Sequence, residues 1–484
     1  MLTLQCNSQT KGIMNVKRLI RNSVFTLSFL ALGGTAMAGE GDTVTVFNSV
    51  RFYDGYLVEN NPDDPTLDGI LRHRTSLYAV KLTDEQLNMM GDKLQMNVWV
   101  QACCDNYDRI GNINLAFVPK GQESYKIDYN NPENNVPRIE IGRFITPFMN
   151  KNKKPNTVPY TYDVPYLSYI FRDKEIREKY DIWVEYELFG VPYAANTQIS
   201  GCSGRSDVFL GTLKFSSQPE NRGVETDKDV LVPIVIKNPE YIAHNLNNYN
   251  ENATDTLGKT VKTYEFEVPK DVQSGMLVLI TSNHGANSGG EEYNRRWHYV
   301  YYDGNEEPIL TYKPGRTSCE PFRKYNTQSN GIYGVWKKSD ASWQSFSNWC
   351  PGDIIDNRII LLGSVKAGKH KVTISVPEAK FADQKGDIPV SMYFHGLTEG
   401  QLDGINDVKA EPTKQFVGFN IADGTLTAQS TEGVVSIEVR DLQGKLLRGN
   451  ECQKTISVAG VPSGIYLVSV ELTNGIIETH KVKL

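Results

Sequence analysis

The sequence predicts a mostly β protein, and two observations support this fold class, while a third, the chain length, indicates the number of domains. Short runs rich in Val, Ile, Tyr and Thr, broken by Gly, Pro and Asn, outnumber helical patterns. Tyrosine and glycine are plentiful, with 25 and 40 residues. The chain has 484 residues, which at roughly 150 residues per domain indicates about three domains. Each of them is long enough to bury a core of its own.

The first predicted domain covers residues 42–219. Its strand-like runs alternate with loops rich in Pro, Asn and Asp, which is typical of an antiparallel sandwich or jelly roll. Residues 139–148 read as a strand that ends at Pro147, and only residues 173–180 read as a helical turn. The other predicted strands are 44–50, 76–81, 94–101, 113–119, 182–189 and 208–215.

Two further domains follow. A polar linker at 216–229 leads into a second β domain of similar length, placed at 224–398, and a linker near 397–412 leads into a small unit at 412–484. The small unit is predicted to be a compact β-sandwich, with a strong hairpin signal at Asn474-Gly475. Predicted strands lie at 230–236, 264–268, 276–280 and 298–302 in the second domain, and at 434–439, 455–458, 464–470 and 476–482 in the third.

Composition excludes nucleic acid as an expected partner. The charged fraction of 22% and the formal net charge of -6 are ordinary, and the chain has no basic block or acidic tail.

The N-terminus predicts export. Lys17, Arg18 and Arg21 form a positive head, residues 24–32 an apolar centre, and residues 36–38 a small-residue cleavage site. Residues 1–38 therefore have the features of a secretory signal peptide. Its apolar run is too short for a transmembrane span, and no later stretch is long enough. We expect an exported monomer in which disulfides are permitted.

Seven cysteines become six when Cys6 leaves with the signal peptide, and six cysteines allow fifteen pairings. We expect Cys319 to pair with Cys350, closing a loop rich in glycine and aromatic residues. One of the adjacent Cys103 and Cys104 is expected to pair with Cys202, because a bond between neighbours would be strained. No C-x-x-C or H-E-x-x-H spacing is present, so we expect no metal site and no cofactor.

Two carboxylates, an aromatic ring and an arginine fall in one short predicted loop. Asp105, Tyr107, Asp108 and Arg109 follow one alternating apolar run and precede another. Loops held by a rigid sheet often carry binding and catalytic groups. The alternative is an ordinary turn, since Asp and Asn bond their own backbone.

A second candidate site loop lies at residues 283–296. Small residues are followed there by Glu291, Glu292 and two arginines, a pattern that makes a poor strand. The alternative is a surface loop without a site.

Three segments share the order and approximate spacing of a known family. They are residues 105–109, then residues 140–148 with the run Gly-Arg-Phe-Ile-Thr-Pro, then Cys319 through residues 326–328 to Trp349-Cys350-Pro351-Gly352. This set resembles the peptide-N-glycosidase F family. The resemblance implies two packed jelly rolls with an active site in the cleft between them. The expected fold class is therefore all-β: two tandem antiparallel jelly-roll or β-sandwich domains and a small C-terminal immunoglobulin-like sandwich.

The resemblance also implies roles for individual acids. Asp108 falls on the family's essential aspartate, and Glu187, on strand 182–189, on a supporting glutamate. When the glycine-rich loop is aligned with the family at His298, a second family glutamate falls on Glu292. An alignment shifted by one residue would place it on Glu291 instead.

Further residues are expected to bind substrate: Tyr107, Arg109, Glu291, His284 and Trp349. The sequence departs from the family pattern at Phe346, where an arginine is expected, and at Asn283 or His284, where a tryptophan is expected. The resemblance therefore supports the family's reaction for this protein more strongly than it supports the family's sugar preference.

The family reaction is hydrolysis of the amide between an N-linked glycan and asparagine, which leaves aspartate and a glycosylamine. We expect Asp108 to activate the attack, Arg109 to stabilise negative charge or orient Asp108, and Glu187 with Glu292 to hold sugar hydroxyls or a water. Tyr107 and Trp349 would flank an N-linked glycoprotein or glycopeptide substrate. Two alternatives stay open: an endoglycosidase using the same carboxylates, and a non-catalytic glycan-binding protein on the cell surface.

The C-terminal unit has its own resemblance. Residues 439–445, residues 461–466 and Lys481 resemble the sorting domain of type IX secretion cargo. This implies the secretion machinery as a partner and delivery to the cell surface or the medium. The alternative is a generic immunoglobulin-like appendage.

Overall fold

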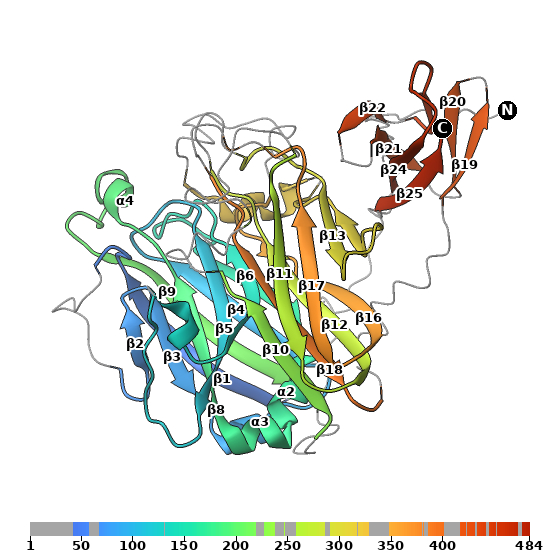
Figure 1. Cartoon of the computed structure of the whole chain (residues 1–484). Coiled ribbons are helices and arrows are strands. Elements are labelled where there is room, and N and C mark those ends of the chain that lie inside the picture. Colours follow the sequence, from blue (N-terminus) through green and yellow to red (C-terminus); the bar gives the residue numbers. More distant parts are fainter. Residues whose placement is uncertain are drawn as a thin grey trace, which may run out of the picture.

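The computed structural model describes residues 42–57, 67–129, 131–218, 227–237, 246, 258–285, 291–316, 318–328, 348–379, 381, 386–400, 417–422, 424–430, 433–441, 445–451, 453–472 and 477–484. The chain forms two large antiparallel sandwiches side by side and a small third one (Figure 1). The predicted all-β class is therefore confirmed. The predicted signal peptide, Cys452 and the hairpin turn at 474–475 lie outside the described residues.

The first sandwich consists of two sheets with the strand orders β1-β9-β4-β7 and β15-β6-β5-β8-β3-β2. Alternation explains their packing: in β4, Met96, Val98 and Val100 point into the core while Gln95 and Gln101 are exposed. The strands of this unit are β1 (Asp42–Tyr53), β2 (Leu71–Arg74), β3 (Leu77–Lys81), β4 (Gln95–Ala102), β5 (Ile110–Pro119), β6 (Arg138–Ile145), β7 (Thr157–Asp163), β8 (Tyr180–Leu188) and β9 (Asp207–Ser217).

The second sandwich has the strand orders β10-β18-β12-β16 and β11-β17-β13-β14. Its two-residue strand β15 pairs with β6 and so extends a sheet of the first sandwich. The strands are β10 (Asp229–Val235), β11 (Val261–Val268), β12 (Val272–Thr281), β13 (His298–Tyr302), β14 (Leu310–Tyr312), β15 (Ile354–Ile355), β16 (Arg358–Val365), β17 (Gly368–Ser375) and β18 (Val390–Leu397).

Strand β6 lies where the two sandwiches meet. All eight of its residues are buried, which an alternating half-exposed strand would not show. Met276, Val278 and Tyr393 of the second sandwich belong to the same hydrophobic cluster as the core of the first. The two units are thus joined by a shared apolar interior.

The third sandwich contains the sheets β19-β20-β23 and β22-β21-β24-β25. It contacts the second sandwich at Trp297, whose indole donates a hydrogen bond to Glu438 and packs on Leu467. Its strands are β19 (Val417–Ala422), β20 (Thr425–Ser430), β21 (Val434–Arg440), β22 (Leu446–Glu451), β23 (Thr455–Ser457), β24 (Ile465–Leu472) and β25 (Ile477–Lys483).

The helical content was underestimated. Residues 173–180 do contain the helix α3, but the prediction that no other segment is helical is wrong. In α1, Thr83 and Gln86 form a capping box, a signal that the sequence carries. The helices are α1 (Asp84–Met89), α2 (Leu167–Arg172), α3 (Lys174–Lys179) and α4 (Tyr193–Gln198), with 3₁₀ helices η1 (Pro132–Asn134) and η3 (Glu320–Tyr325).

We propose to keep the predicted domain limits of 42–219, 224–398 and 412–484. Among the described residues, no helix is both long and apolar enough to cross a membrane.

Candidate active site

The loop that carries Asp108 is fixed from two sides. It joins β4 to β5, as the alternating pattern predicted. Asp105 accepts the amide hydrogen of Tyr107 over 2.9 Å within the loop. From the end of β6, the hydroxyl of Thr146 accepts the Arg109 amide over 2.7 Å and donates to the Tyr107 carbonyl over 3.1 Å. The Gly-Arg-Phe-Ile-Thr-Pro segment thus sets the backbone on both sides of Asp108.

The side chain of Arg109 pairs with Asp105. Its Nε lies 2.7 Å from Asp105 Oδ2, and its guanidinium lies 5.2 Å from the centre of the Tyr107 ring. Asp105 is completely buried, and burial raises its pKa although Arg109 acts in the opposite direction. Arg109 therefore neutralises a buried carboxylate and stiffens the loop, while its charge still acts on Asp108.

Asp108 and Glu292 come together from the two sandwiches. Burial first, and then the nearby charge of Glu292, raise the pKa of Asp108 to about 7, against the opposing charge of Arg109. Burial also raises the pKa of Glu292, while hydrogen bonds from the Gly285 amide and the Tyr293 hydroxyl lower it. The Gly285 amide lies 3.0 Å from Glu292 Oε2. The charge of Glu292 thus reaches Asp108 from the other sandwich, and the resulting pKa of Asp108, about 7, lets this carboxyl group exchange a proton near neutral pH.

The neighbouring Glu291 has a different environment. It is 1% exposed, and its carboxylate accepts hydrogen bonds from Arg296 over 2.8 and 3.2 Å. The Asn348 side chain donates to the backbone carbonyls of both glutamates, over 2.9 and 2.7 Å. Of the two glutamates, Glu291 is thus paired with Arg296, whereas the charge of Glu292 acts on Asp108.

The loop at 282–285 contacts Glu292 through the Gly285 amide, and it is itself held by Trp349. The ring of His284 stacks on Trp349 with centres 6.0 Å apart, and the indole of Trp349 donates to the Asn283 carbonyl over 3.0 Å. Burial, with Arg143 nearby, lowers the pKa of His284 to about 3, so the imidazole is neutral at pH 7. Trp349 is 4% exposed, so it is a buried neighbour of this loop. The contacts with substrate that the sequence predicts for His284 and Trp349 stay predictions.

Arg143, which no sequence pattern singled out by itself, joins the sandwiches at this loop. Its guanidinium is completely buried and pairs with Glu140 over 2.7 and 2.8 Å. It also donates to Ser282 over 2.8 Å and to the Pro389 carbonyl over 3.0 Å, both in the second sandwich. Its place in the family-like segment was the only signal, because sequence does not reveal which strand lies between two domains.

Glu187 lies further along the same sheet. The register of β5 pairs Asn112 with both Glu187 and Arg143, so these three residues form one row across the sheet. Glu187 accepts a hydrogen bond over 3.4 Å from Lys237 of the second sandwich, and the charge of Lys237 also acts on His284. Glu292 and Glu187 are therefore both connected to the 282–285 loop, Glu292 through Gly285 and Glu187 through Lys237. No contact that the structure describes joins Glu187 directly to Asp108 or Glu292.

Two disulfides brace the region. Cys319 bonds Cys350, which confirms the predicted pair, and lies in one apolar cluster with Trp349 and Tyr107. Cys104 is the member of the adjacent pair that bonds Cys202, and Cys103 is a buried free thiol. Within the described part of the chain, no cluster of three or more His, Cys, Asp or Glu side chains could hold a metal ion.

Comparison with known families agrees with this architecture. The models described as peptide-N-glycosidase F, N terminal and C terminal, match residues 43–203 and 248–395. The model described as secretion system C-terminal sorting domain matches residues 419–483. The last match marks the protein for type IX secretion to the cell surface or extracellular space. No curated protein matches the sequence.

Solved structures show the same fold. Two crystal forms of PNGF-II align with TM-scores of 0.52 and 0.51 at 18% and 19% identity, each over 74% of this chain. The alignments cover 66% and 65% of the PNGF-II chains, slightly under two thirds. PNGase F, a glycosylasparaginase from Flavobacterium meningosepticum, aligns with a TM-score of 0.44 at 15% identity, over 74% of this chain and 96% of its own. From the two family models and the fold, the chain belongs to the peptide-N-glycosidase F family.

Proposed function

We propose that this protein is a peptide-N-glycosidase that hydrolyses the amide between an N-linked glycan and asparagine, giving aspartate and a glycosylamine. The observation that carries the proposal is that Asp108, fixed between β4 and β5, feels the charge of Glu292 from the second sandwich, and that burial with this charge raises the pKa of Asp108 to about 7. A general base is most effective when its pKa lies near the working pH, where proton transfer contributes typically 10²–10⁴-fold.

In the proposed mechanism, Asp108 activates the attack on the side-chain carbonyl of asparagine, directly or through a water. Glu292 is oriented by the Gly285 amide and the Tyr293 hydroxyl, and it holds the sugar or the attacking water. Arg109 acts on Asp108 by charge, while its side chain stays on Asp105. Glu187, with Lys237 beside it, binds sugar hydroxyls further along the row.

The test uses purified protein and a glycopeptide with one N-linked glycan. A peptidase-free incubation should release the glycan and leave a peptide whose asparagine has become aspartate, as read by mass spectrometry. Asp108→Asn should abolish release and keep the wild-type circular dichroism spectrum. A peptide that keeps one sugar on asparagine would instead identify an endoglycosidase, and binding without any cleavage would identify a glycan-binding protein.

A further inference from the structure

Two exposed tyrosines pack on each other near the loop that carries Asp108. The side chains of Tyr56 and Tyr193 are 65% and 61% exposed. Their rings are nearly parallel, with planes 8° apart and centres 6.3 Å apart. Tyr56 also contacts the ring of Phe189 edge-on at 5.3 Å. Large aromatic rings that cluster on a surface usually mark an interaction site.

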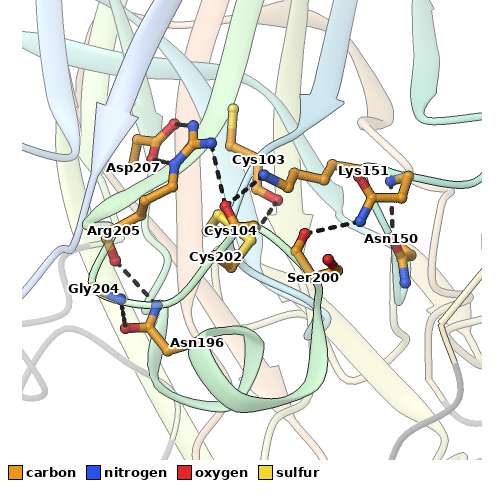
Figure 2. Close-up of a disulfide and its surroundings, with 12 residues drawn as sticks. Cys103, Cys104, Asn150, Lys151, Asn196, Ser200, Cys202, Gly204, Arg205 and Asp207 are labelled. Carbon is orange, nitrogen blue, oxygen red and sulfur yellow. Dashed lines mark hydrogen bonds and ion pairs between the residues drawn. A yellow bond between two sulfur atoms is a disulfide. The ribbon is translucent and has the colours of Figure 1, made fainter.

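The segment that presents Tyr193 is held firmly. It connects β8 to β9 and contains α4, and the Cys104–Cys202 disulfide ties it to the loop that carries Asp108 (Figure 2). Asn196 closes the segment on itself, accepting the Gly204 amide and donating to the Arg205 carbonyl, each over 3.1 Å. Lys151 donates to the Gly201 carbonyl over 2.8 Å. A binding surface with so many internal bonds loses little conformational freedom when a ligand arrives.

This segment continues directly into the candidate active site. Asp105, the partner of Arg109, accepts the Val191 amide over 2.7 Å, and Asn106 donates to Gln198 of α4 over 2.7 Å. Phe189 follows Leu188, which the register pairs with Gly111 at the start of β5. Phe189, on which Tyr56 packs, is the first residue after β8 and lies two residues beyond Glu187. The tyrosine pair therefore lies at the end of β8 that carries Glu187.

The chemistry of the pair suits a saccharide. The faces of tyrosine rings can cover the C–H faces of sugar rings, and the phenol hydroxyls bond sugar hydroxyls, since tyrosine combines an apolar body with a polar tip. Asp54 holds both members: it accepts the Tyr56 amide over 3.1 Å and hydrogen-bonds the Tyr193 hydroxyl. The acidic neighbour disfavours an anionic ligand, and a neutral oligosaccharide carries no such penalty.

We propose that Tyr56 and Tyr193 form a second sugar-binding site, which holds the outer saccharides of an N-linked glycan while its innermost sugar lies at Asp108. The link to cleavage rests on the proposed function, but sugar binding at the pair is testable alone. The ligand is an uncharged oligosaccharide of several rings, and the site selects substrates by glycan length.

The kinetic test compares two glycopeptides, one with a complete oligosaccharide and one trimmed to the innermost sugar. The double variant Tyr56→Ala/Tyr193→Ala should raise KM for the complete glycan roughly tenfold, as expected for two lost ring contacts, and leave kcat unchanged. The trimmed substrate should be cleaved as by wild type. Tyr56→Phe/Tyr193→Phe keeps both rings and should retain most of the affinity. Leu361→Ala, at an exposed position 47% accessible on the second sandwich, is the remote control.

The direct test measures binding of the free uncharged oligosaccharide by calorimetry or NMR titration. Weakened binding in the alanine double variant, with wild-type affinity in Leu361→Ala, supports the site. Equal affinity in all variants, or an equal loss for long and trimmed substrates, overturns it. If wild type cleaves no glycopeptide but the tyrosine pair binds sugar, the proposed function fails and the binding site stands. If wild type cleaves the glycopeptide but the alanine variant binds sugar equally well, the proposed function stands and the binding site fails.

Discussion

Two carboxylates of the first sandwich, the buried Glu185 and the half-buried Asp108, have opposite electrostatic environments. Glu185 on β8 is completely buried and accepts hydrogen bonds from Arg138, the Tyr125 hydroxyl and Asn114, at 2.8, 2.6 and 2.9 Å. Burial raises its pKa, but Arg138 and these hydrogen bonds outweigh burial, and the net pKa is lowered. For Asp108, burial and Glu292 act in the same direction and the pKa rises.

The contrast separates a structural acid, Glu185, from the acid that we propose to be catalytic, Asp108. Burial alone does not decide the direction of a pKa shift, because nearby charges and hydrogen-bond partners also shift the pKa. Glu185 is a fixed negative charge that ties β5, β6 and β8 together. For Asp108, Arg109 compensates only in part, so its pKa of about 7 suits a proton-transferring group near neutral pH.

The largest expected effect is on stability, from Arg138→Leu. This change leaves Glu185 buried without its cation, which typically costs about 3–5 kcal/mol. Chemical denaturation should show this loss. The double variant Arg138→Leu/Glu185→Leu should recover much of it, because the unpaired charge is gone. A loss below about 1 kcal/mol in the single variant would contradict the view of Glu185 as a neutralised structural acid.

The second effect concerns the pKa of Asp108. Glu292→Gln removes the negative neighbour, so the pKa should fall by about one unit, equivalent to about 1.4 kcal/mol. A carboxyl NMR titration of Asp108 measures this directly. The matched control is Glu291→Gln at the adjacent position, where Arg296 already neutralises the acid, and the Asp108 titration should not move. An unchanged midpoint in Glu292→Gln would show that burial alone sets the pKa.

The third effect is a pH-dependent gain in stability from Asp108→Asn. The pKa of Asp108 is about 7 in the folded protein, against an ordinary value of 3.8 for an aspartate in water. Between these values the folded state binds more protons than the unfolded state, so wild-type stability falls as pH rises through this window. The asparagine variant does not titrate there and should be more stable at pH 8 by on the order of 1 kcal/mol. The gain should vanish near pH 4, and a gain independent of pH would refute this origin.

The smallest effect should come from Tyr293→Phe. The Tyr293 hydroxyl lowers the pKa of Glu292 by a hydrogen bond, so its removal should raise that pKa by a few tenths of a unit. NMR titration of Glu292 reads the shift. A downward shift would mean that the hydroxyl does not favour the charged carboxylate.

Most strands could be predicted from the sequence, because the alternation of apolar and polar residues that predicts a strand spans only a few neighbouring positions. Alternation placed the loop of Asp108 between β4 and β5, and the same rule located β8 and β13. Short helices such as α2 and α4 were missed, since six residues give too few turns for a periodic pattern. The family-like segments identified the acids, but not their environments.

The sequence by itself determined the all-β class and the sorting domain, and it proposed Asp108, Glu187 and Glu292 as the acids of the site, because strand alternation and short motifs lie within a few residues. Only the tertiary structure decided that the charge of Glu292 acts on Asp108 while Glu291 pairs with Arg296, that Arg109 pairs with Asp105, and that Arg143 joins the two sandwiches. The first and third outcomes depend on groups that meet across more than a hundred residues of chain, whereas Asp105 and Arg109, four residues apart, pair only once the loop between β4 and β5 has folded. Burial and partner charges, which set each pKa, exist only once the sheets have packed.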